Sequence, residues 1–453
     1  MASIRAFRGV RYNLARIPDL SRVVTQPYDR IGPDLQSSYY ELDPYNYVRL
    51  ILNRRGPQDA AGSDTYTRAR DTLKQWSRDG ILVRDAALAL YVYHQTFPMA
   101  DGSLRTRKAF LAVMQLASFD EGIVLPHERT LSGPKADRLN LFRATGANLE
   151  PVFLLYPDRG NAINRELDQV ISGQPPDADI HELLEGDVRQ QMWVVEDKGC
   201  LARVSALAAP MRNLIVADGH HRYETALNYR NEMRAARPVD PPGAPYNFVL
   251  AAFVNMFDPG LVILPTHRLV HSYGRLTGGE LLSLAPRYFV ITQVSDRAAL
   301  LQGLAGGPEP EHRLGFVTRD RCYLWILQDG TVMDKLAPDH GAAWRELDVS
   351  ILHELVLEKL LGISKDSITR KENLEYLRDP APGFAALDRG EAEFLFLLNP
   401  TRLAQVAACA TVGEKMPQKS TDFYPKMISG LVLYPLQGDE GHAGVQALHS
   451  ETP

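Results

Sequence analysis

The chain has little cysteine and no long apolar run. It has three cysteines among 453 residues, Cys200, Cys322 and Cys409, and no two of them form a C-x-x-C spacing. This argues against a disulfide framework or a cysteine-rich zinc site and favours a reducing compartment. No stretch reaches the roughly 18 apolar residues that a membrane-spanning helix needs, and the first residues lack the apolar core of a signal peptide. We therefore predict a cytoplasmic protein without a membrane anchor.

Neither sign of charge is in large excess. Lys and Arg total 50, Asp and Glu total 55, and the formal net charge is −5. This near-balance argues against a nucleic-acid coat protein or a polybasic membrane binder, although a local basic patch is compatible with it. Hydrophobic residues make up 45% and charged residues 23%, which is typical of a globular protein and excludes global disorder.

The motifs of several large enzyme classes are also missing. The sequence has no G-x-S-x-G, no G-x-G-x-x-G after an apolar strand, no Walker A loop and no H-R-D or D-F-G set. Each of these motifs supplies working parts of its class: a nucleophile elbow, a dinucleotide turn, a phosphate loop or a protein-kinase site. The ordinary hydrolase, Rossmann, P-loop and protein-kinase interpretations therefore have no basis here.

The apolar residues alternate between strand-like and helix-like spacing. Helices are expected over residues 66–76 and 347–361, where apolar side chains share one face. Asp101-Gly102 predicts a hairpin turn. The expected strands cover residues 87–97, 108–119, 151–156, 248–257, 261–270, 289–291, 314–317, 323–327 and 394–398. This mixture predicts an α/β (mixed α+β) fold with partly antiparallel sheets.

We expect three regions and a tail. The regions are an N-terminal α/β region over 1–160, a second over 161–275 and a C-terminal α/β region over 276–436, and residues 437–453 are expected to be a disordered tail. Surface linkers are expected over 173–179 and 235–245, which are rich in Pro, Gly and Asp.

The strongest candidate for chemistry is Asp218-Gly219-His220-His221-Arg222, between an apolar strand and a helix. The N-terminus of a helix presents unbonded amides and the positive end of the helix dipole, which attract an anion. Glycine allows close approach of the backbone, and a guanidinium can bind phosphate oxygens in pairs.

The same residues have a structural interpretation. Asp218 can be a helix N-cap, with both histidines merely exposed. Five polar or special residues in succession favour a functional turn. Direct metal binding by Asp218 with His220 or His221 is a third option, although adjacent histidines rarely reach the same ion.

A second polar segment carries His127, Glu128, Lys135, Asp137 and Arg138. It is not H-E-x-x-H, so it does not predict a zinc protease. A carboxylate beside a histidine suits a general base acting on a hydroxyl, and Lys135 and Arg138 suit phosphate. A salt-bridged surface loop is the alternative.

Two further segments complete the candidates. Residues 413–426 contain Lys415, Lys419, Ser420 and Thr421 in a stretch that prolines interrupt too often for a regular element. Its lysines could neutralise phosphates, or the stretch could be a basic surface loop. Asp29, after Pro27-Tyr28, is either a catalytic acid or base or a turn cap.

Several of these segments together resemble a bacterial family known as a domain of unknown function (number 1015). They are Tyr28-Asp29, Pro44-Tyr45-Asn46, His127-Glu128-x-Thr130, Asp137-Arg138, Asp218-Gly219-His220-His221-Arg222 and Met416-Pro417-Gln418-Lys419-Ser420-Thr421. The resemblance spans residues 4 to 435. The turn at Asp218 also resembles the phosphate-binding turn of the ParB/sulfiredoxin superfamily, which would make 161–275 a ParB-like nucleotide-binding region.

The resemblance implies a kinase of free L-serine that uses ATP or ADP and Mg²⁺ and forms O-phospho-L-serine. Gly219, His220, His221 and Arg222 would hold the nucleotide phosphates, with Asp218 a ligand of Mg²⁺ directly or through water. The resemblance also implies the base and the groups that bind the phosphate and the serine carboxylate. Glu128, or less favourably Asp29, would accept the hydroxyl proton beside His127, and the phosphate and serine carboxylate would be bound by Lys135, Arg138, Lys415, Lys419, Ser420 and Thr421.

Two other functions stay open at this point. A ParB-type switch would bind or hydrolyse CTP without an acceptor, and nucleotide binding would then be insensitive to serine. A non-catalytic interaction protein would bind no nucleotide. ParB proper usually carries Gly-Glu-Arg-Arg at the turn, whereas here the acid precedes the glycine. We expect small-molecule partners, no nucleic acid and no membrane, and the sequence allows a homodimer.

Overall fold

The computed structural model describes residues 2–436 except 58, 61, 62, 131, 185, 237, 238, 309 and 310. The predicted tail, 437–453, lies outside the described residues. The chain divides into two compact units. Unit 1 contains Met1–Pro126, Thr130–Leu261 and Pro425–Pro453, and unit 2 contains His127–Arg129 and Val262–Tyr424. Each unit is therefore built from segments that are distant in the sequence.

The predicted hairpin is confirmed in unit 1. β4 (Leu90–Pro98) and β5 (Leu104–Gln115) pair antiparallel around Asp101-Gly102, where Gly102 has φ +80°. Glycine adopts this left-handed conformation without the steric penalty of a Cβ. Residues 109 to 114 of β5 are all buried, which is expected where both faces of a sheet are covered.

The hairpin lies within a nine-stranded mixed sheet in the described part of unit 1. The order along the sheet is β6 (Val124–Pro126), β11 (Leu214–Asp218), β8 (Val152–Tyr156), β12 (Phe248–Asn255), β5, β4, β10 (Arg189–Val195) and β9 (Ala178–His181), with β1 (Ile4–Arg5) also paired to β5. The β6–β11 and β8–β12 pairs are parallel and the other pairs are antiparallel. The predicted mixed fold with partly antiparallel sheets is thus confirmed.

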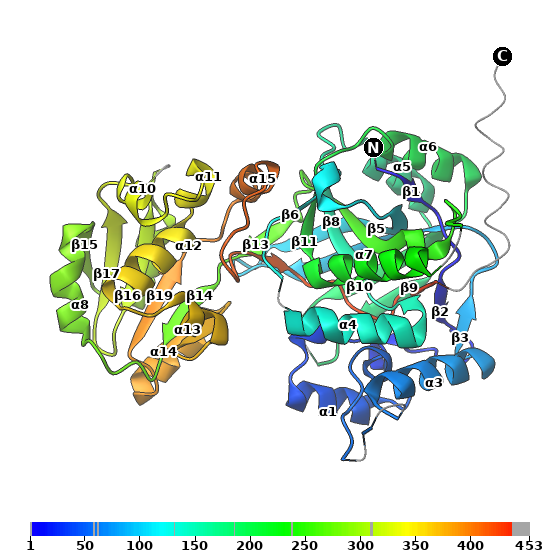
Figure 1. Cartoon of the computed structure of the whole chain (residues 1–453), viewed down its shortest axis with the longest axis horizontal. Coiled ribbons are helices and arrows are strands. Elements are labelled where there is room, and N and C mark those ends of the chain that lie inside the picture. The colour runs from blue at the N-terminus through cyan, green and yellow to red at the C-terminus, as the bar shows by residue number, and fades with distance from the viewer. Residues whose placement is uncertain are drawn as a thin grey trace. The chain divides into compact units, whose positions relative to one another are not determined.

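Helices cover this sheet and a smaller layer beside it. The helices of unit 1 are α1 (Pro33–Leu42), α2 (Val48–Ile51), α3 (Thr65–Arg78), α4 (Ser132–Thr145), α5 (Ala162–Ile171), α6 (Lys198–Ala208) and α7 (His220–Ala235) (Figure 1). Apolar side chains of α5, α6 and α7 join the strands in one buried cluster, and α1, α2 and α3 contribute to a second. α4 packs along α7. Two short pairs, β2 (Val10–Tyr12) with β3 (Leu82–Arg84) and β7 (Ala147–Asn148) with β21 (Tyr434–Pro435), complete unit 1.

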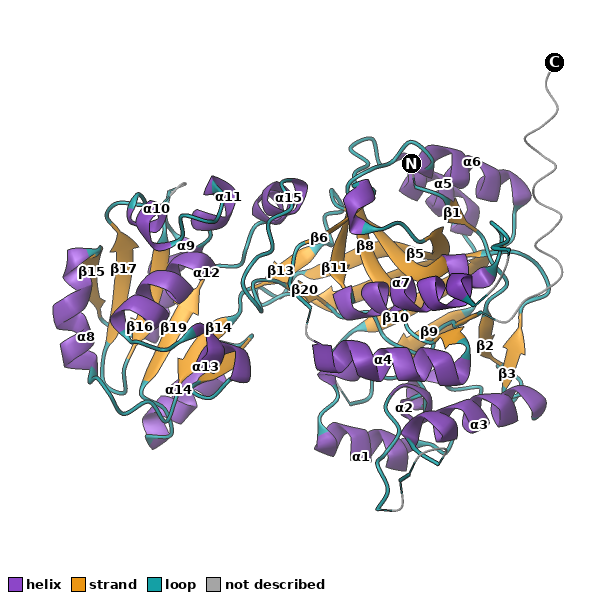
Figure 2. Cartoon of the chain, viewed as in Figure 1, coloured by secondary structure: helices purple, strands orange, loops and turns teal. Residues whose placement is uncertain are grey.

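Unit 2 is built around a six-stranded antiparallel sheet (Figure 2). Its order is β15 (Phe289–Val294), β17 (Cys322–Leu327), β16 (Arg313–Val317), β19 (Phe394–Leu398), β14 (His267–Val270) and β18 (Leu374–Leu377). β13 (Val262–Leu264) pairs with β20 (Asp422–Tyr424). The helices are α8 (Gly278–Leu284), α9 (Arg297–Ala305), α10 (Val332–Leu336), α11 (Ala342–Arg345), α12 (Asp348–Ile351), the π-helix η6 (Leu352–Leu360), α13 (Lys365–Arg370), α14 (Pro380–Arg389) and α15 (Leu403–Thr411).

Three expectations about elements require correction. The strand expected over 261–270 is two strands, β13 and β14, in different sheets, because Pro265 interrupts the run. The helix expected over 347–361 is the short α12 followed by a π-helix. An apolar stripe predicts a helical element but does not determine which carbonyl each amide bonds. Residues 413–426, expected to lack regular structure, contain β20.

The units differ from the predicted regions. Strands from both 1–160 and 161–275 lie in the one nine-stranded sheet, so these two regions form one unit. These segments belong to the same sheet because strands that are distant in sequence form hydrogen bonds with one another. Among the described residues, no helix has both the length and the apolar character needed to cross a membrane.

Candidate functional site

The Asp218 turn joins a buried strand to the longest α-helix described in unit 1. β11 ends at Asp218, Gly219 has φ +88°, and the 16-residue α7 begins at His220. No side chain caps the first turn of α7. A Cβ on Gly219 would lie 2.9 Å from Arg222 Nε, so the glycine permits both the backbone turn and the close approach of the guanidinium. The predicted strand–turn–helix arrangement is present.

Asp218 lies between two cationic groups. Its Oδ2 accepts a 2.6 Å hydrogen bond from Arg222 Nη2, and its Oδ1 lies 3.2 Å from Lys426 Nζ. Although burial alone would raise the pKa of the Asp218 carboxyl, Lys426 and Arg222 hold it well below its ordinary value. Arg222 also donates to the carbonyl oxygen of Pro151. Asp218 is therefore a negatively charged partner of two cations.

Arg222 has a donor without an acceptor. Its side chain is 7% exposed, and its Nε has no hydrogen-bond acceptor among the described residues. Burial lowers the pKa of the guanidinium, but the carboxylates of Asp218, Glu150 and Asp29 outweigh that effect and raise it above its ordinary value. The group is thus a buried, charged donor beside the Gly219 turn.

Glu150 joins three segments of unit 1 beneath this turn. Its carboxylate accepts hydrogen bonds from the Tyr28 backbone amide at 3.1 Å and from Ser429 Oγ at 2.9 Å. Its other oxygen lies 3.6 Å from Arg138 Nη1, and its side chain is 4% exposed. The Arg138 guanidinium in turn lies over the Tyr28 ring, 4.0 Å from its centroid. Glu150 thus fixes the Tyr28 segment and the loop segment that contains Lys426 and Ser429.

Of the predicted residues of unit 1, Asp29 lies at the surface and Lys135 forms an ion pair. Asp29 is exposed and belongs to the short 3₁₀ turn Tyr28–Arg30, and its charge acts on Arg222. Lys135 Nζ lies 2.9 Å from Glu224 Oε2 on α7, and Thr130 Oγ1 donates to the same carboxylate. Lys135 is therefore fixed beside the second turn of α7.

The residues at the turn do not fit a resident magnesium ion. Both oxygens of Asp218 are already bonded to cations, and Mg²⁺ would have to displace them. Across the described ranges, no group of three or more His, Cys, Asp and Glu side chains is placed to hold a metal. Because both oxygens of Asp218 are paired with Arg222 and Lys426, the structure argues against direct ligation of Mg²⁺ by Asp218.

The His127-Glu128 pair belongs to unit 2. His127 is fully buried, and its Nε2 lies 2.8 Å from Thr421 Oγ1. The same hydroxyl lies 3.4 Å from Glu128 Oε1. A parallel bridge between Glu128 and Met416, with the Met416 amide bonded to the His127 carbonyl at 2.8 Å, holds the two segments side by side. The structure therefore brings together three predicted residues that are almost 300 positions apart.

The remaining predicted residues of unit 2 lie on the same loop. Ser420 is buried, its hydroxyl donates to the Pro417 carbonyl, and its own carbonyl accepts from Thr401 Oγ1 at 2.7 Å. Lys419 is exposed and has φ +56°, which is unusual for a residue with a side chain. The Lys415 carbonyl accepts from Trp344 Nε1 at 3.1 Å. The loop is thus held by its backbone, with Lys419 directed outward.

Sequence reasoning missed three residues that organise these groups. Lys426 lies within the predicted 413–426 segment, and its cationic side chain was the available signal. Glu150 is an acid immediately before an apolar strand, and Arg268 is a guanidinium within another. A charged residue beside or inside an apolar strand indicates a buried ion pair or a functional group.

The predicted site residues form two groups, one in each unit. Unit 1 holds Asp29, Lys135, Arg138, Asp218, Gly219, His220, His221 and Arg222, and unit 2 holds His127, Glu128, Lys415, Lys419, Ser420 and Thr421. Within each group the named contacts show which residues are neighbours. The roles assigned to them remain predictions.

Comparison with known proteins gives a family and distant structural likenesses. A conserved hypothetical protein from Pyrococcus furiosus is 12% identical with a TM-score of 0.33, covering 69% of this chain and 92% of its own. A free serine kinase in complex with AMP is 12% identical with a TM-score of 0.33, covering 68% of this chain and 89% of its own. SbnI from Staphylococcus aureus, with a C-terminal truncation, is 11% identical with a TM-score of 0.33, covering 70% of this chain and 87% of its own. Likenesses at this level assign no activity to the chain.

No curated protein matches the sequence. The family model described as "Protein of unknown function (DUF1015)" matches residues 4–350. That match includes the Asp218 turn, the Tyr28 segment and the His127-Glu128 pair. The chain therefore belongs to the DUF1015 family.

Proposed function

We propose that this protein is a nucleotide-dependent phosphotransferase that transfers a phosphoryl group from ATP or ADP to the hydroxyl of free L-serine. The observation that carries the proposal is the Arg222 Nε–H, a buried charged donor without an acceptor among the described residues, beside the uncapped first turn of α7. A phosphate oxygen is the acceptor that suits such a donor, because guanidinium groups and helix N-termini both bind phosphate.

Asp218 keeps the cationic groups in place before a nucleotide arrives. Without a ligand, the Asp218 carboxylate is bonded to both Arg222 and Lys426. A bound phosphate would interact with the same two cations. Phosphoryl transfer needs charge neutralisation and in-line positioning more than covalent help from the protein. Mg²⁺ enters the proposal with the nucleotide, where it would neutralise phosphate charge, because Mg²⁺ is usually bound through substrate phosphates and retained waters.

Asp29 and Glu128 are the two candidate bases. Asp29 shares unit 1 with the helix turn, is exposed, and acts electrostatically on Arg222. Glu128 lies in unit 2 within 3.4 Å of the Thr421 hydroxyl, which shows that its carboxylate can accept from a hydroxyl. On present geometry we favour Asp29 as the base that accepts the serine hydroxyl proton, with Glu128 as the alternative.

The test is an assay of O-phosphoserine formation by purified protein with ATP or ADP, Mg²⁺ and L-serine. We expect product with at least one donor. Arg222→Ala should lower kcat/KM by about tenfold or more, the effect of one lost charge-assisted hydrogen bond. Arg143→Ala, which removes an exposed ion pair with Glu232 and a hydrogen bond to Asn140, is the matched control on the same unit.

Four results would count against the proposal. Absence of product with every donor refutes the kinase activity, and full turnover by Arg222→Ala refutes the phosphate role of the turn. Nucleotide binding that L-serine never affects would favour the ParB-type switch instead. A true ligand at 100 times its Kd adds about 2.7 kcal/mol of stability, so an unchanged Tm under those conditions would favour a non-catalytic protein.

A further inference from the structure

Arg268 is a fully buried guanidinium in β14 of unit 2. Its exposed fraction is 0%. Its Nη1 donates to the Thr266 carbonyl, and its Nη2 lies 3.3 Å and 3.1 Å from the carbonyl oxygens of Gln418 and Lys419. Three of its hydrogen bonds therefore go to backbone carbonyls, and two of these belong to the 416–421 loop.

The charge of Arg268 has no direct counter-ion. Among the residues that the structure describes, no carboxylate lies within ion-pair distance of it, and its remaining partners are His353 Nε2 at 3.2 Å and the Tyr376 ring at 4.6 Å. Burial lowers the pKa of the guanidinium only to about 10, so it is charged at neutral pH. A buried cation without a paired anion is costly and is usually compensated.

The partner histidine lies in a rare structural element. His353 belongs to the nine-residue π-helix Leu352–Leu360 and is 8% exposed. Burial and the Arg268 charge lower the pKa of its imidazole well below the ordinary value, so it is neutral and can accept from Arg268. π-helical turns are uncommon and are frequent at functional sites. The π-helix thus supplies one hydrogen-bond partner of the guanidinium, His353 Nε2.

The loop itself has an excess of positive charge. Lys419 lies on the loop and Lys415 directly before it, and no ion pair of either lysine is found among the described residues. The two acids that flank the loop already have partners: Glu414 is bonded to His340 and Asp422 to Arg378. Glu128 is the acidic group whose charge acts on Arg268. An anion at the loop would therefore be attracted by cations that no carboxylate pairs directly.

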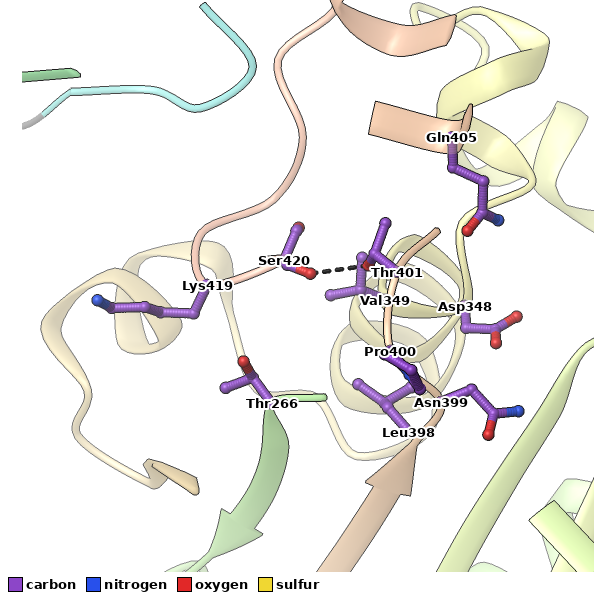
Figure 3. Close-up of a pocket in the computed structure, with 10 residues that line it drawn as sticks. All are labelled: Thr266, Asp348, Val349, Leu398, Asn399, Pro400, Thr401, Gln405, Lys419 and Ser420. Atoms are coloured by element: carbon purple, nitrogen blue, oxygen red, sulfur yellow. Dashed lines mark hydrogen bonds between the residues drawn. The ribbon is translucent and has the colours of Figure 1, made fainter. Parts of the chain in front are cut away.

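Figure 3 shows how the loop is seated. Lys419 extends away from Thr401, while the Ser420 carbonyl accepts from the Thr401 hydroxyl, beside Thr266 at the start of β14. Lys419 and Ser420 line a partly open hollow whose empty volume of about 300 Å³ includes open solvent. The backbone of the loop is therefore fixed on its inner side by Arg268 and Thr401, while the Lys419 side chain is accessible.

We infer that the 416–421 loop binds a phosphate group and that Arg268 is its positioning residue. Arg268 fixes the carbonyls of Gln418 and Lys419 and places a positive charge beneath the loop. The inference names a phosphate group only, and it does not depend on the proposed function. Phosphate binding by this loop can be measured without turnover.

The experiment measures hydrogen exchange of peptides covering 416–424 in the full-length protein, with and without inorganic pyrophosphate, together with pyrophosphate affinity and Tm. Arg268→Lys keeps the charge but cannot donate to His353 and both loop carbonyls together. Lys419→Met removes the exposed charge and leaves the buried residues unchanged. Leu300→Ala, in the fully buried face of α9, is the control that destabilises unit 2 without touching the loop.

We expect pyrophosphate to slow exchange of the loop in the wild type. Arg268→Lys and Lys419→Met should each weaken this protection by about tenfold, as expected for one lost charge-assisted hydrogen bond. Leu300→Ala should lower Tm and retain full protection.

The inference is overturned if pyrophosphate leaves the wild-type loop unprotected, or if Arg268→Lys lowers Tm like Leu300→Ala but keeps the wild-type affinity. Arg268-dependent protection in a protein that forms no O-phosphoserine would support the inference and refute the serine kinase activity alone. Formation of O-phosphoserine by a protein whose loop pyrophosphate does not protect would support the serine kinase activity and refute the inference.

Discussion

The ion pair between Arg222 and Asp218 gives a quantitative test of how the turn is stabilised. The two side chains are 7% and 19% exposed, and their nearest atoms are 2.6 Å apart. The test compares Arg222→Met, Asp218→Asn and the double variant. Methionine keeps much of the apolar stem, and asparagine keeps the shape of the carboxylate, so both changes remove charge with little change in volume.

The magnitude follows from burial. Removing one partner of a buried pair costs about 3–5 kcal/mol because the other charge is left uncompensated. Asp218 retains Lys426 when Arg222 is removed, so that variant should lie near about 3 kcal/mol. Asp218→Asn removes the carboxylate that both Arg222 and Lys426 bind and should cost at least as much. The double variant should fall short of the sum by about 1–3 kcal/mol, the usual coupling of contacting residues.

The assay is urea unfolding followed by tryptophan fluorescence. Trp76 and Trp193 belong to unit 1, and Trp325 and Trp344 belong to unit 2. Replacing the two tryptophans of unit 2 by phenylalanine leaves fluorescence that reports on unit 1. The reasoning is refuted if the two single effects add to within about 0.5 kcal/mol, because additivity at that level indicates independent residues.

Three further predictions follow from the same geometry. The pKa of the Asp218 carboxyl is depressed in the folded state, so the charged carboxylate should stabilise the fold fully above the unfolded pKa of about 3.9. That stabilisation should be lost as pH falls below this value. In acid titrations, the difference in stability between wild type and Asp218→Asn should therefore shrink below about pH 4 and stay constant above it. In thermal unfolding, Gly219→Ala should destabilise the protein more than Gly80→Ala. Both glycines have positive φ, but only a Cβ at Gly219 meets another group, 2.9 Å from Arg222 Nε. Equal losses of Tm in the two variants would contradict this. Thr421→Val should lower Tm more than Thr421→Ser, because only valine removes the hydroxyl 2.8 Å from His127 Nε2; equal Tm values would show that the contact does not contribute to stability.

Local patterns predicted many of the elements. β8, β16, β17 and β19 lie within a residue or two of the predicted strands, because short apolar runs between turn signals are typical of buried strands. The hairpin at Asp101-Gly102 and the turn at Gly219 followed from glycine's access to positive φ. The strand at 261–270 and the helix at 347–361 were wrong in detail, since periodicity reports a buried face and not the hydrogen-bond partner.

The sequence also identified most polar segments but not their partners. Asp218 and Arg222 were selected together because they flank one turn, whereas Lys426 joins them from a loop 208 positions after Asp218. Glu150 and Arg268 were missed for the same reason, since their importance depends on contacts with residues far along the chain.

By itself the sequence determined a mixed α/β protein, its family signature segments, and the strand–turn–helix at Asp218. Those properties depend on residues that are close together in the chain, where backbone conformation, apolar spacing and charge act locally. Only the tertiary structure determined that the chain forms two discontinuous units, that Asp218 is held by two cations, and that Arg268 is buried beneath the Lys419 loop. Those properties depend on strand pairing and on the exclusion of water from charged groups, and both arise when distant segments pack together.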